Sequence, residues 1–186
     1  EVADIPWDEL EDPSAWCTSR SASTKGRDGC RVPLPWVAAD APQLDDPNDE
    51  FGHGGSFGFS PADAKAEPHL PQPKWYKDFA VDVESADPDS MLNLYRRVLA
   101  LRHELQTTDL SLEWLPEDQP GKAHDGANGF PGDTIAYRRA NGWASITNFG
   151  EEPITLPQGE VLLTSGPLTD DGKLPQDTSA WLKLAD

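Results

Sequence analysis

The clearest periodic pattern of apolar residues lies in the middle of the chain. Between residues 91 and 105 the apolar side chains recur at spacings of three and four, which places them on one face of an α-helix. The preceding Asp87-Pro88-Asp89-Ser90 is a typical helix start, with Asp87 as capping carboxylate and Pro88 at the first helical position. The sequence therefore predicts a helix of about four turns that packs on one face. The apolar stripe consists of Met91, Leu92, Leu94, Tyr95, Val98, Leu99, Leu101 and Leu105.

Short runs typical of β-strands follow this helix. After Gln106 the pattern changes from helical to extended. We place a domain boundary near Thr107 and expect an antiparallel β-domain of about 80 residues after it, a size that can fold when its core is well filled. The strands are predicted at Leu112–Leu115, Thr134–Arg139, Trp143–Phe149, Val161–Ser165 and Thr178–Leu184.

One predicted hairpin sets a strand register. The Asn141-Gly142 pair is typical of a two-residue turn between two strands. With such a turn, Tyr137 faces Ile146 across the pair, and Ile135 lies on the same side of the ribbon as Ala144. We expect one face of this ribbon to belong to the core.

Residues 1–86 show no sustained period of either kind. Prolines recur throughout this segment and block long helices. An irregular stretch of this length is uncommon inside a compact domain unless it is functional or lies over another part of the protein. Its large aromatic side chains therefore need a surface to pack on. These side chains are Trp7, Trp16, Trp36, Phe51, Phe57, Phe59 and Trp75.

Charge and hydropathy narrow the expected partners and location. The chain has 15 Lys and Arg residues against 33 Asp and Glu residues, a formal net charge of −18, which argues against nucleic acid and anionic membranes as partners. Because no apolar run is long enough to span a bilayer and the first residues lack a signal-peptide pattern, we expect a cytoplasmic protein. Cys17 and Cys30 are too few for a disulfide scaffold, and we expect both to be reduced.

The densest candidate for chemistry is Gly26–Trp36, with the sequence Gly-Arg-Asp-Gly-Cys-Arg-Val-Pro-Leu-Pro-Trp. The glycines on either side of Asp28 favour a tight loop that presents the planar donor groups of Arg27 and Arg31. On residue types alone, a surface turn with a local Arg–Asp pair is the commoner explanation. Binding of a neutral sugar is the functional interpretation, because arginine can hold both a carboxylate and hydroxyl oxygens.

No metal or cofactor site is predicted. Nothing places a histidine beside Cys17 or Cys30, so we interpret both thiols as inert. The histidines share no metal-ligand spacing with each other or with the cysteines. The acidic stretch Asp45–Glu50 lacks the pattern of a calcium-binding loop and is interpreted as a solvated loop.

The segment Gly26–Trp36 closely resembles the corresponding loop of bacterial α-glucosidases of the oligo-1,6-glucosidase kind, in the α-amylase family (glycoside hydrolase family 13). Further motifs agree in order, so the resemblance covers essentially the whole chain. His69 departs from the family, whose members typically carry tryptophan before Leu-Pro. The other matching segments are Leu70–Pro73, Asp87–Arg97, Leu99–Arg102, Asn148–Gly150 and Leu156–Gly159.

The resemblance implies a mixed fold. Residues 1–106 would be the end of a catalytic (β/α)8 TIM barrel, with a long loop and the last helix, and residues 107–186 an all-β antiparallel sandwich domain. The family's nucleophile aspartate, acid/base glutamate and second aspartate lie on earlier barrel strands, so we expect no catalytic residue in this chain. The N-terminal barrel portion of the same enzyme is the implied partner.

The implied activity is that of a retaining α-glucosidase, which hydrolyses terminal α-linked glucose from short oligosaccharides. The chain would supply part of the pocket for an α-glucosidic oligosaccharide. We expect Arg27 to reach the glucose ring at the cleavage point and to pair with an upstream aspartate. Arg31 either shapes the same loop or touches the leaving-group sugar, and Asp28 fixes the turn.

Two other functions are open at this stage. Residues 107–186 could form a non-catalytic carbohydrate-binding module, in which exposed Trp114, Trp143 or Trp181 stack on sugar rings. Exposure of these rings would favour that function, and burial would disfavour it. The chain could also belong to a transporter-associated scaffold that kept the fold without catalysis.

Overall fold

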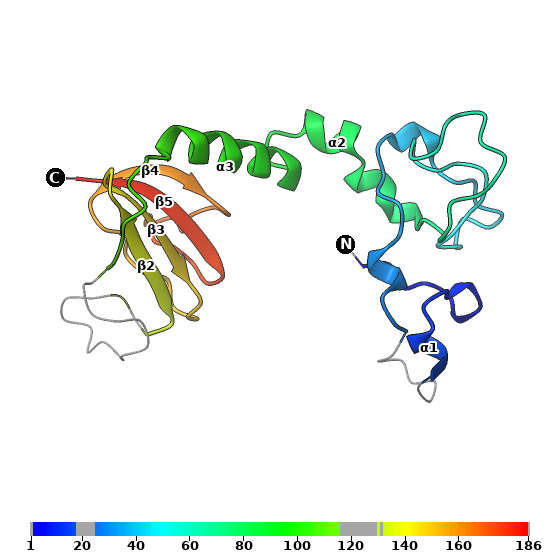
Figure 1. Cartoon of the computed structure of the whole chain (residues 1–186), viewed down its shortest axis with the longest axis horizontal. Coiled ribbons are helices and arrows are strands. Elements are labelled where there is room, and N and C mark those ends of the chain that lie inside the picture. Colours follow the sequence, from blue (N-terminus) through cyan, green and yellow to red (C-terminus); the bar gives the residue numbers. More distant parts are fainter. Residues whose placement is uncertain (1, 18–24, 116–129, 131, 186) are drawn as a thin grey trace. The chain divides into compact units, whose positions relative to one another are not determined.

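A computed structural model describes residues 2–17, 25–115, 130 and 132–185 of the protein. The chain forms two compact units, a first unit Glu1–Tyr95 and a second unit Arg96–Asp186 (Figure 1). The division between them falls inside the central helix. The sequence instead places a boundary near Thr107, just after that helix.

The first unit is built from short helical turns joined by irregular chain. No helix in its described part before residue 87 is longer than six residues, as the recurring prolines predict. Two isolated β-bridges, Gln43 with His53 and Phe51 with Pro73, join distant parts of this chain. The elements are the 3-10 helices η1 (Trp7–Glu9), η2 (Asp28–Cys30), η3 (Ala38–Asp40) and η4 (Lys74–Phe79), and the α-helices α1 (Ser14–Cys17) and α2 (Val81–Ala86).

A small apolar core fills this unit and takes up several of the aromatic side chains. Phe57 is fully buried, and Trp7, Phe51 and Trp75 pack against the same core. By contrast, Trp36 is 50% exposed, and Phe59 is also exposed. Phe57, Trp7, Phe51 and Trp75 therefore find their packing surface within this unit. The buried members of the core are Ala3, Ile5, Leu10, Ala15, Val32, Phe57, Leu70 and Tyr76.

The predicted central helix is present as α3 (Met91–Leu105). It begins later than predicted, because the Ser90 hydroxyl accepts the N–H of Asn93 at 3.2 Å. The Asp87 carboxylate instead accepts the N–H of Asp89 at 2.9 Å, in the turn before the helix. No residue of α3 is buried, so the predicted packing of its apolar stripe is not found within the described residues. The most exposed members of the stripe are Met91, Leu99 and Tyr95.

All five predicted strands are present and form one antiparallel sheet in the order β1-β2-β3-β5-β4 (Figure 1). The predicted antiparallel β-domain is thus confirmed. The described strands make a single sheet, whereas a sandwich contains two. The strands are β1 (Leu112–Trp114), β2 (Thr134–Arg139), β3 (Trp143–Asn148), β4 (Gly159–Thr164) and β5 (Thr178–Leu184).

The pairing of β2 with β3 differs by one residue from the predicted register. Tyr137 lies opposite Ser145 and not opposite Ile146. Because side chains alternate between the two faces of a sheet, this shift moves every side chain of β2 to the other face relative to β3. Ile135 and Ala144 therefore lie on opposite faces, and the predicted register is wrong.

The turn explains the shift. Gly142 has a φ of +79°, in the left-handed region, and its N–H donates to the Arg139 carbonyl oxygen at 2.9 Å. The connection consequently spans the three residues 140–142 and not two. Three-residue hairpins with glycine in the left-handed position are the next most common class after two-residue turns.

One face of the sheet covers a core. Ala136, Ile146 and Ala180 lie side by side on β2, β3 and β5. Ile154 and Leu174, from the segments that flank β4, belong to the same buried cluster. The backbones of these two residues exchange hydrogen bonds of 3.0 and 2.9 Å, which ties the two connecting segments together.

Candidate functional site

The predicted tight loop, Gly26–Arg31, packs closely on the start of the first unit. Gly26 has a φ of +78°, a conformation that favours glycine. A Cβ atom on Gly29 would lie 2.2 Å from the carbonyl oxygen of Ala3, which leaves no room for a side chain. The Gly29 carbonyl oxygen also accepts the N–H of Ala3 at 3.0 Å. Both glycines are therefore required by the path of this loop.

Asp28 is buried beneath the loop, with 2% of its side chain exposed. Its Oδ2 atom accepts the backbone N–H groups of Glu11 and Asp12 at 2.7 and 2.6 Å. Its Oδ1 atom lies 3.6 Å from Nη1 of Arg31. These contacts fasten the loop to a segment that lies 16 and 17 residues earlier in the chain.

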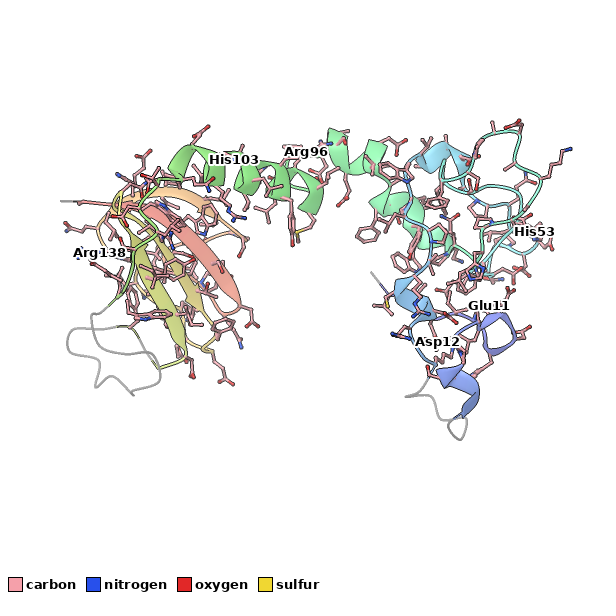
Figure 2. The ribbon with its side chains drawn as sticks, in the orientation of Figure 1. Glu11, Asp12, His53, Arg96, His103 and Arg138 are labelled. Atoms are coloured by element: carbon pink, nitrogen blue, oxygen red, sulfur yellow. The ribbon has the colours of Figure 1, made fainter. Side chains whose placement is uncertain are left out.

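Asp12 is a second buried carboxylate of the site, with 3% of its side chain exposed (Figure 2). Its Oδ1 atom accepts the N–H and the hydroxyl of Ser14 at 2.9 and 2.8 Å. Its Oδ2 atom accepts the backbone N–H and Nε of Arg27 at 3.1 and 3.3 Å, and lies 3.4 Å from Nη1 of Arg31. The Ser14 N–H is the largest of the contacts that hold the pKa of Asp12 well below its ordinary value.

Asp12 is not among the site residues predicted from the sequence. Asp12-Pro13-Ser14 carries the same helix-start signal as the segment before α3, a capping residue followed by proline. That signal identifies the local contact with Ser14 at the start of α1. The contacts with Arg27 and Arg31 join residues 15 and 19 positions apart, and no local pattern reports them.

Arg27 and Arg31 differ in how far their side chains are engaged. The Arg27 side chain is 72% exposed, and its contact with Asp12 uses only the Nε edge. Among the described residues, no hydrogen bond or ion pair holds its two terminal nitrogens. The Arg31 side chain is 46% exposed and reaches both Asp12 and Asp28. The site therefore presents one guanidinium edge that can donate to a hydroxyl or a carboxylate.

The aspartate that contacts Arg27 belongs to the same unit. The family resemblance implies that Arg27 pairs with an aspartate of the preceding barrel portion, and that pairing stays a prediction. Because an arginine has donors on Nε and on both terminal nitrogens, the contact with Asp12 leaves room for a second acceptor. The geometry thus permits Arg27 to bridge Asp12 and a ligand.

The other chemical candidates make single polar contacts: the Cys30 thiol donates to the Arg27 carbonyl oxygen at 3.0 Å, and His53 Nε2 lies 3.3 Å from Asp45 Oδ1. Cys30 is a free, exposed thiol, and the side chain of Cys17 lies outside the described residues. In the described part of the chain, no group of three or more His, Cys, Asp or Glu side chains could hold a metal ion. No helix in that part has the length and apolar character needed to cross a bilayer.

A row of aromatic rings crosses the sheet on the face opposite the core. Trp114 contacts Tyr137, Tyr137 contacts Trp143, and Trp143 contacts Trp181, with centroid distances of 6.2, 6.4 and 5.0 Å. The planes of neighbouring rings differ by 85°, 64° and 45°. Trp114 is 37% exposed, and the other three are half-buried. The first two pairs pack edge to face and the Trp143–Trp181 pair is tilted, so the rings do not form a flat platform for a sugar.

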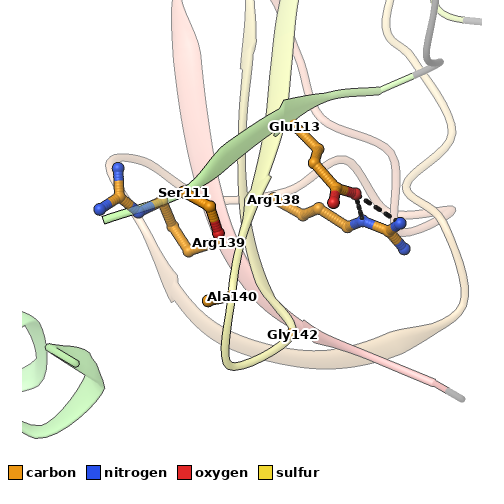
Figure 3. A pocket seen from close by; sticks show the side chains of 6 residues that line it. All are labelled: Ser111, Glu113, Arg138, Arg139, Ala140 and Gly142. Carbon is orange, nitrogen blue, oxygen red and sulfur yellow. Dashed lines mark hydrogen bonds and ion pairs between the residues drawn. The ribbon is translucent and has the colours of Figure 1, made fainter. Parts of the chain in front are cut away.

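A shallow pocket lies at the hairpin end of β2 (Figure 3). Its charged residues are largely paired with each other, because Arg138 Nε donates to Glu113 Oε2 at 2.6 Å and Nη2 lies 2.5 Å from the same atom. Among the described residues that line this pocket there is no histidine, no cysteine and no buried carboxylate. It offers little for catalysis compared with the Arg27 loop.

The chain is similar in sequence to a known enzyme over about half of its length. No protein-family model matches the chain. A probable α-glucosidase of Rhizobium meliloti (strain 1021) is 31% identical over 103 residues, which cover 54% of this chain and 14% of that protein. The chain thus spans about one-seventh of the length of this curated relative.

Solved structures resemble nearly the whole chain. The α-glucosyl transfer enzyme XgtA matches with a TM-score of 0.57 and 25% identity, over 97% of this chain and 30% of that one. The trehalose-6-phosphate hydrolase TreA of Bacillus licheniformis matches in fold with a TM-score of 0.53 and 21% identity, over 87% of this chain and 27% of that one. The chain therefore spans less than a third of these proteins.

Proposed function

We propose that this chain, which corresponds to a C-terminal portion of an α-amylase-family glucosidase, supplies a substrate-pocket loop and the β-domain of a retaining α-glucosidase. The complete enzyme removes terminal α-linked glucose from short oligosaccharides. Its nucleophile and acid/base carboxyl groups lie in the preceding portion of the polypeptide. One attacks the anomeric carbon, and the other donates and then accepts a proton.

The observation that carries this proposal is the exposed edge of Arg27 above two buried carboxylates. Asp12 and Asp28 fix the loop, and Arg27 contacts Asp12 through Nε, so among the described residues its terminal nitrogens have no partner. A guanidinium held in this way donates to a sugar hydroxyl without first losing much side-chain freedom. Arg31 contacts both aspartates, so its role is to shape the loop or to touch the leaving-group sugar.

The proposal includes a partner for the exposed apolar surfaces. Residues 1–106 complete the (β/α)8 barrel of the enzyme. The N-terminal portion of that barrel, which precedes this chain, covers the apolar stripe of α3. The exposure of Met91, Tyr95 and Leu99 supports this assignment, because a stripe of this size is unusual on a free helix. A cytoplasmic location and the lack of nucleic-acid or membrane partners belong to the same proposal.

The other functions have less support. A carbohydrate-binding module would use the face that carries Trp114, Trp143 and Trp181, but these rings are tilted against their neighbours and only Trp114 is exposed. Sugar rings stack on exposed aromatic faces. The transporter-associated scaffold shares the fold and differs only in lacking hydrolysis, so an activity measurement separates it from the enzyme.

The test compares the complete protein with the isolated 186-residue chain. NMR of the first glucose released from an α-linked disaccharide should show the α-anomer for the complete protein. The isolated chain should release none from a chromogenic α-glucoside. A β-anomer would refute retention, and an inactive complete protein would favour the scaffold. Turnover by the pure isolated chain, lost on changing one of its acidic residues, would refute the placement of the catalytic carboxylates.

A further inference from the structure

We infer that Asp12 is a positioning residue, whose buried carboxylate holds the guanidinium of Arg27 in the orientation that meets the substrate. This inference rests on the proposed binding role of Arg27. It concerns a residue that lies 15 positions before Arg27 and outside the Gly26–Trp36 motif.

Both oxygens of the Asp12 carboxylate are engaged. Oδ1 receives two hydrogen bonds from Ser14, and Oδ2 receives the backbone N–H and Nε of Arg27. The N–H of Asp12 is itself held by Asp28 at 2.6 Å. A carboxylate fixed on this many sides cannot turn, so the contact with Nε fixes the plane of the Arg27 guanidinium.

Close packing removes the remaining freedom. A Cβ atom on Gly26 would lie 2.9 Å from Cβ of Asp12 and 2.8 Å from Oγ of Ser14. The backbone just before Arg27 therefore passes directly over the carboxylate. Arg27 is anchored at its N–H and its Nε by one oxygen, and only the terminal nitrogens stay available for a ligand.

The charge of Asp12 suits this role. Its pKa, held below the ordinary value chiefly by the N–H of Ser14, keeps the carboxylate ionised at neutral pH. Asparagine has nearly the same shape, but its amide carries an NH₂ group where Asp12 has an oxygen. Because the backbone N–H of Ser14 and the Nε of Arg27 are both donors, one of them faces that NH₂ group in either orientation.

The experiment uses the complete protein and the substitution Asp12→Asn. We expect kcat/KM on an α-linked disaccharide to fall about tenfold or more, since misplacing a binding group by a fraction of an ångström has effects of this order. The matched control is Asp4→Asn. Asp4 also pairs with a basic residue of the first unit, Lys25 at 2.5 Å, but does not touch Arg27. It should leave kcat/KM unchanged.

A double-mutant cycle with Arg27→Ala separates positioning from a general structural role. If Asp12 acts through Arg27, adding Asp12→Asn to Arg27→Ala should lower kcat/KM by less than about twofold further. If Asp12 only stabilises the fold, its effect should be the same in both backgrounds. Should Asp12→Asn fail to fold, Ser14→Ala removes one donor to Oδ1 and should give a smaller loss that also vanishes with Arg27→Ala.

The outcomes distinguish this inference from the proposed function. Wild-type kinetics for Arg27→Ala would remove the binding role of Arg27 and the inference with it. A strong loss for Arg27→Ala, together with losses that multiply in the double variant, would overturn the positioning role and leave the binding role of Arg27 intact. An Asp12→Asn variant whose kcat/KM equals that of the Asp4→Asn control would also overturn the positioning role of Asp12 and leave the binding role of Arg27 intact.

Discussion

Replacing Arg27 by alanine is the most direct test of the candidate site. The substitution removes a side chain that is 72% exposed and that, among the described residues, contacts the side chain of Asp12 alone. The cost to folding should be small, because Asp12 keeps both contacts with Ser14 and the nearby Nη1 of Arg31. The penalty of a buried carboxylate without any partner therefore does not arise. The expected effect lies in substrate binding and turnover.

The size of that effect follows from the bonds that the guanidinium edge can make. A hydrogen bond to a charged group contributes about 1.5–3 kcal/mol. Because about 1.4 kcal/mol corresponds to a factor of ten in rate, kcat/KM should fall about 10- to 100-fold. The Arg31→Ala variant should lose less, since Arg31 is turned toward Asp12 and Asp28.

The assay is steady-state hydrolysis of an α-linked disaccharide by the complete protein, with circular dichroism to confirm folding. Arg138→Ala is the matched control, because Arg138 is also a part-exposed arginine in an ion pair, with Glu113 in the second unit. It should behave as wild type. A folded Arg27→Ala variant that keeps more than about a third of wild-type kcat/KM, a barrier change well under 1 kcal/mol, would refute the reasoning.

Two further predictions concern the thiols and acid stability. Thiol titration of the denatured chain without reductant should return two groups, from Cys17 and Cys30, and a value of zero would contradict this. The pKa of Asp12 in the folded protein lies below the ordinary value of 3.8. The ionised carboxylate therefore stabilises the folded state above about pH 4, and this contribution is lost as the pH falls below 3.8. The urea midpoint of the protein should therefore begin to drop as the pH falls below about 4 and keep dropping below pH 3, and it should drop less in the Asp12→Asn variant. Equal drops in both proteins would contradict this.

Secondary structure was largely predictable from the sequence, because local patterns determine it. The bounds of β2 and β5 agree with prediction at both ends, and β1, β3 and β4 differ by at most two residues. The register of the β2–β3 hairpin was not predictable in the same way. An Asn-Gly pair suits both two-residue and three-residue turns, and the glycine is left-handed in both. The three-residue turn is identified by the hydrogen bond from the Gly142 N–H to the Arg139 carbonyl oxygen and by the φ of Asn141, which is not positive as a two-residue turn of this type requires.

The central helix shows a second limit of local patterns. Its period identified α3, but Asp87 and Ser90 both suit the capping position, and the sequence does not say which one accepts the first N–H. The same period predicts a packed face. It does not show which part of a polypeptide supplies the opposing surface, and α3 has no buried residue in this chain.

The site was predictable only in part, because its contacts are long-range. The composition of Gly26–Trp36 pointed to Arg27, Asp28 and Arg31. The structure adds Asp12, which reaches the loop through contacts across at least 15 residues. This irregular chain has neither a helical nor a strand period. The sequence therefore gives no sign that the segment around Asp12 contacts the loop Gly26–Arg31.

Aspartate carboxylates, some buried and some exposed, take the place of regular secondary structure in the first unit. Asp28 accepts two backbone N–H groups. Asp40 accepts the backbone N–H groups of Ser56 and Gly58 at 3.1 and 2.7 Å. The hydrogen bond from Gly58 is the main cause of the lowered pKa of Asp40. Without these carboxylates, the backbone N–H groups would lack hydrogen-bond acceptors where prolines interrupt helices. Aspartates that satisfy the backbone also fix loops rigidly. In the case of Asp12, the same carboxylate that caps a short helix orients Arg27, so the order of this irregular unit and its proposed binding role have one physical cause.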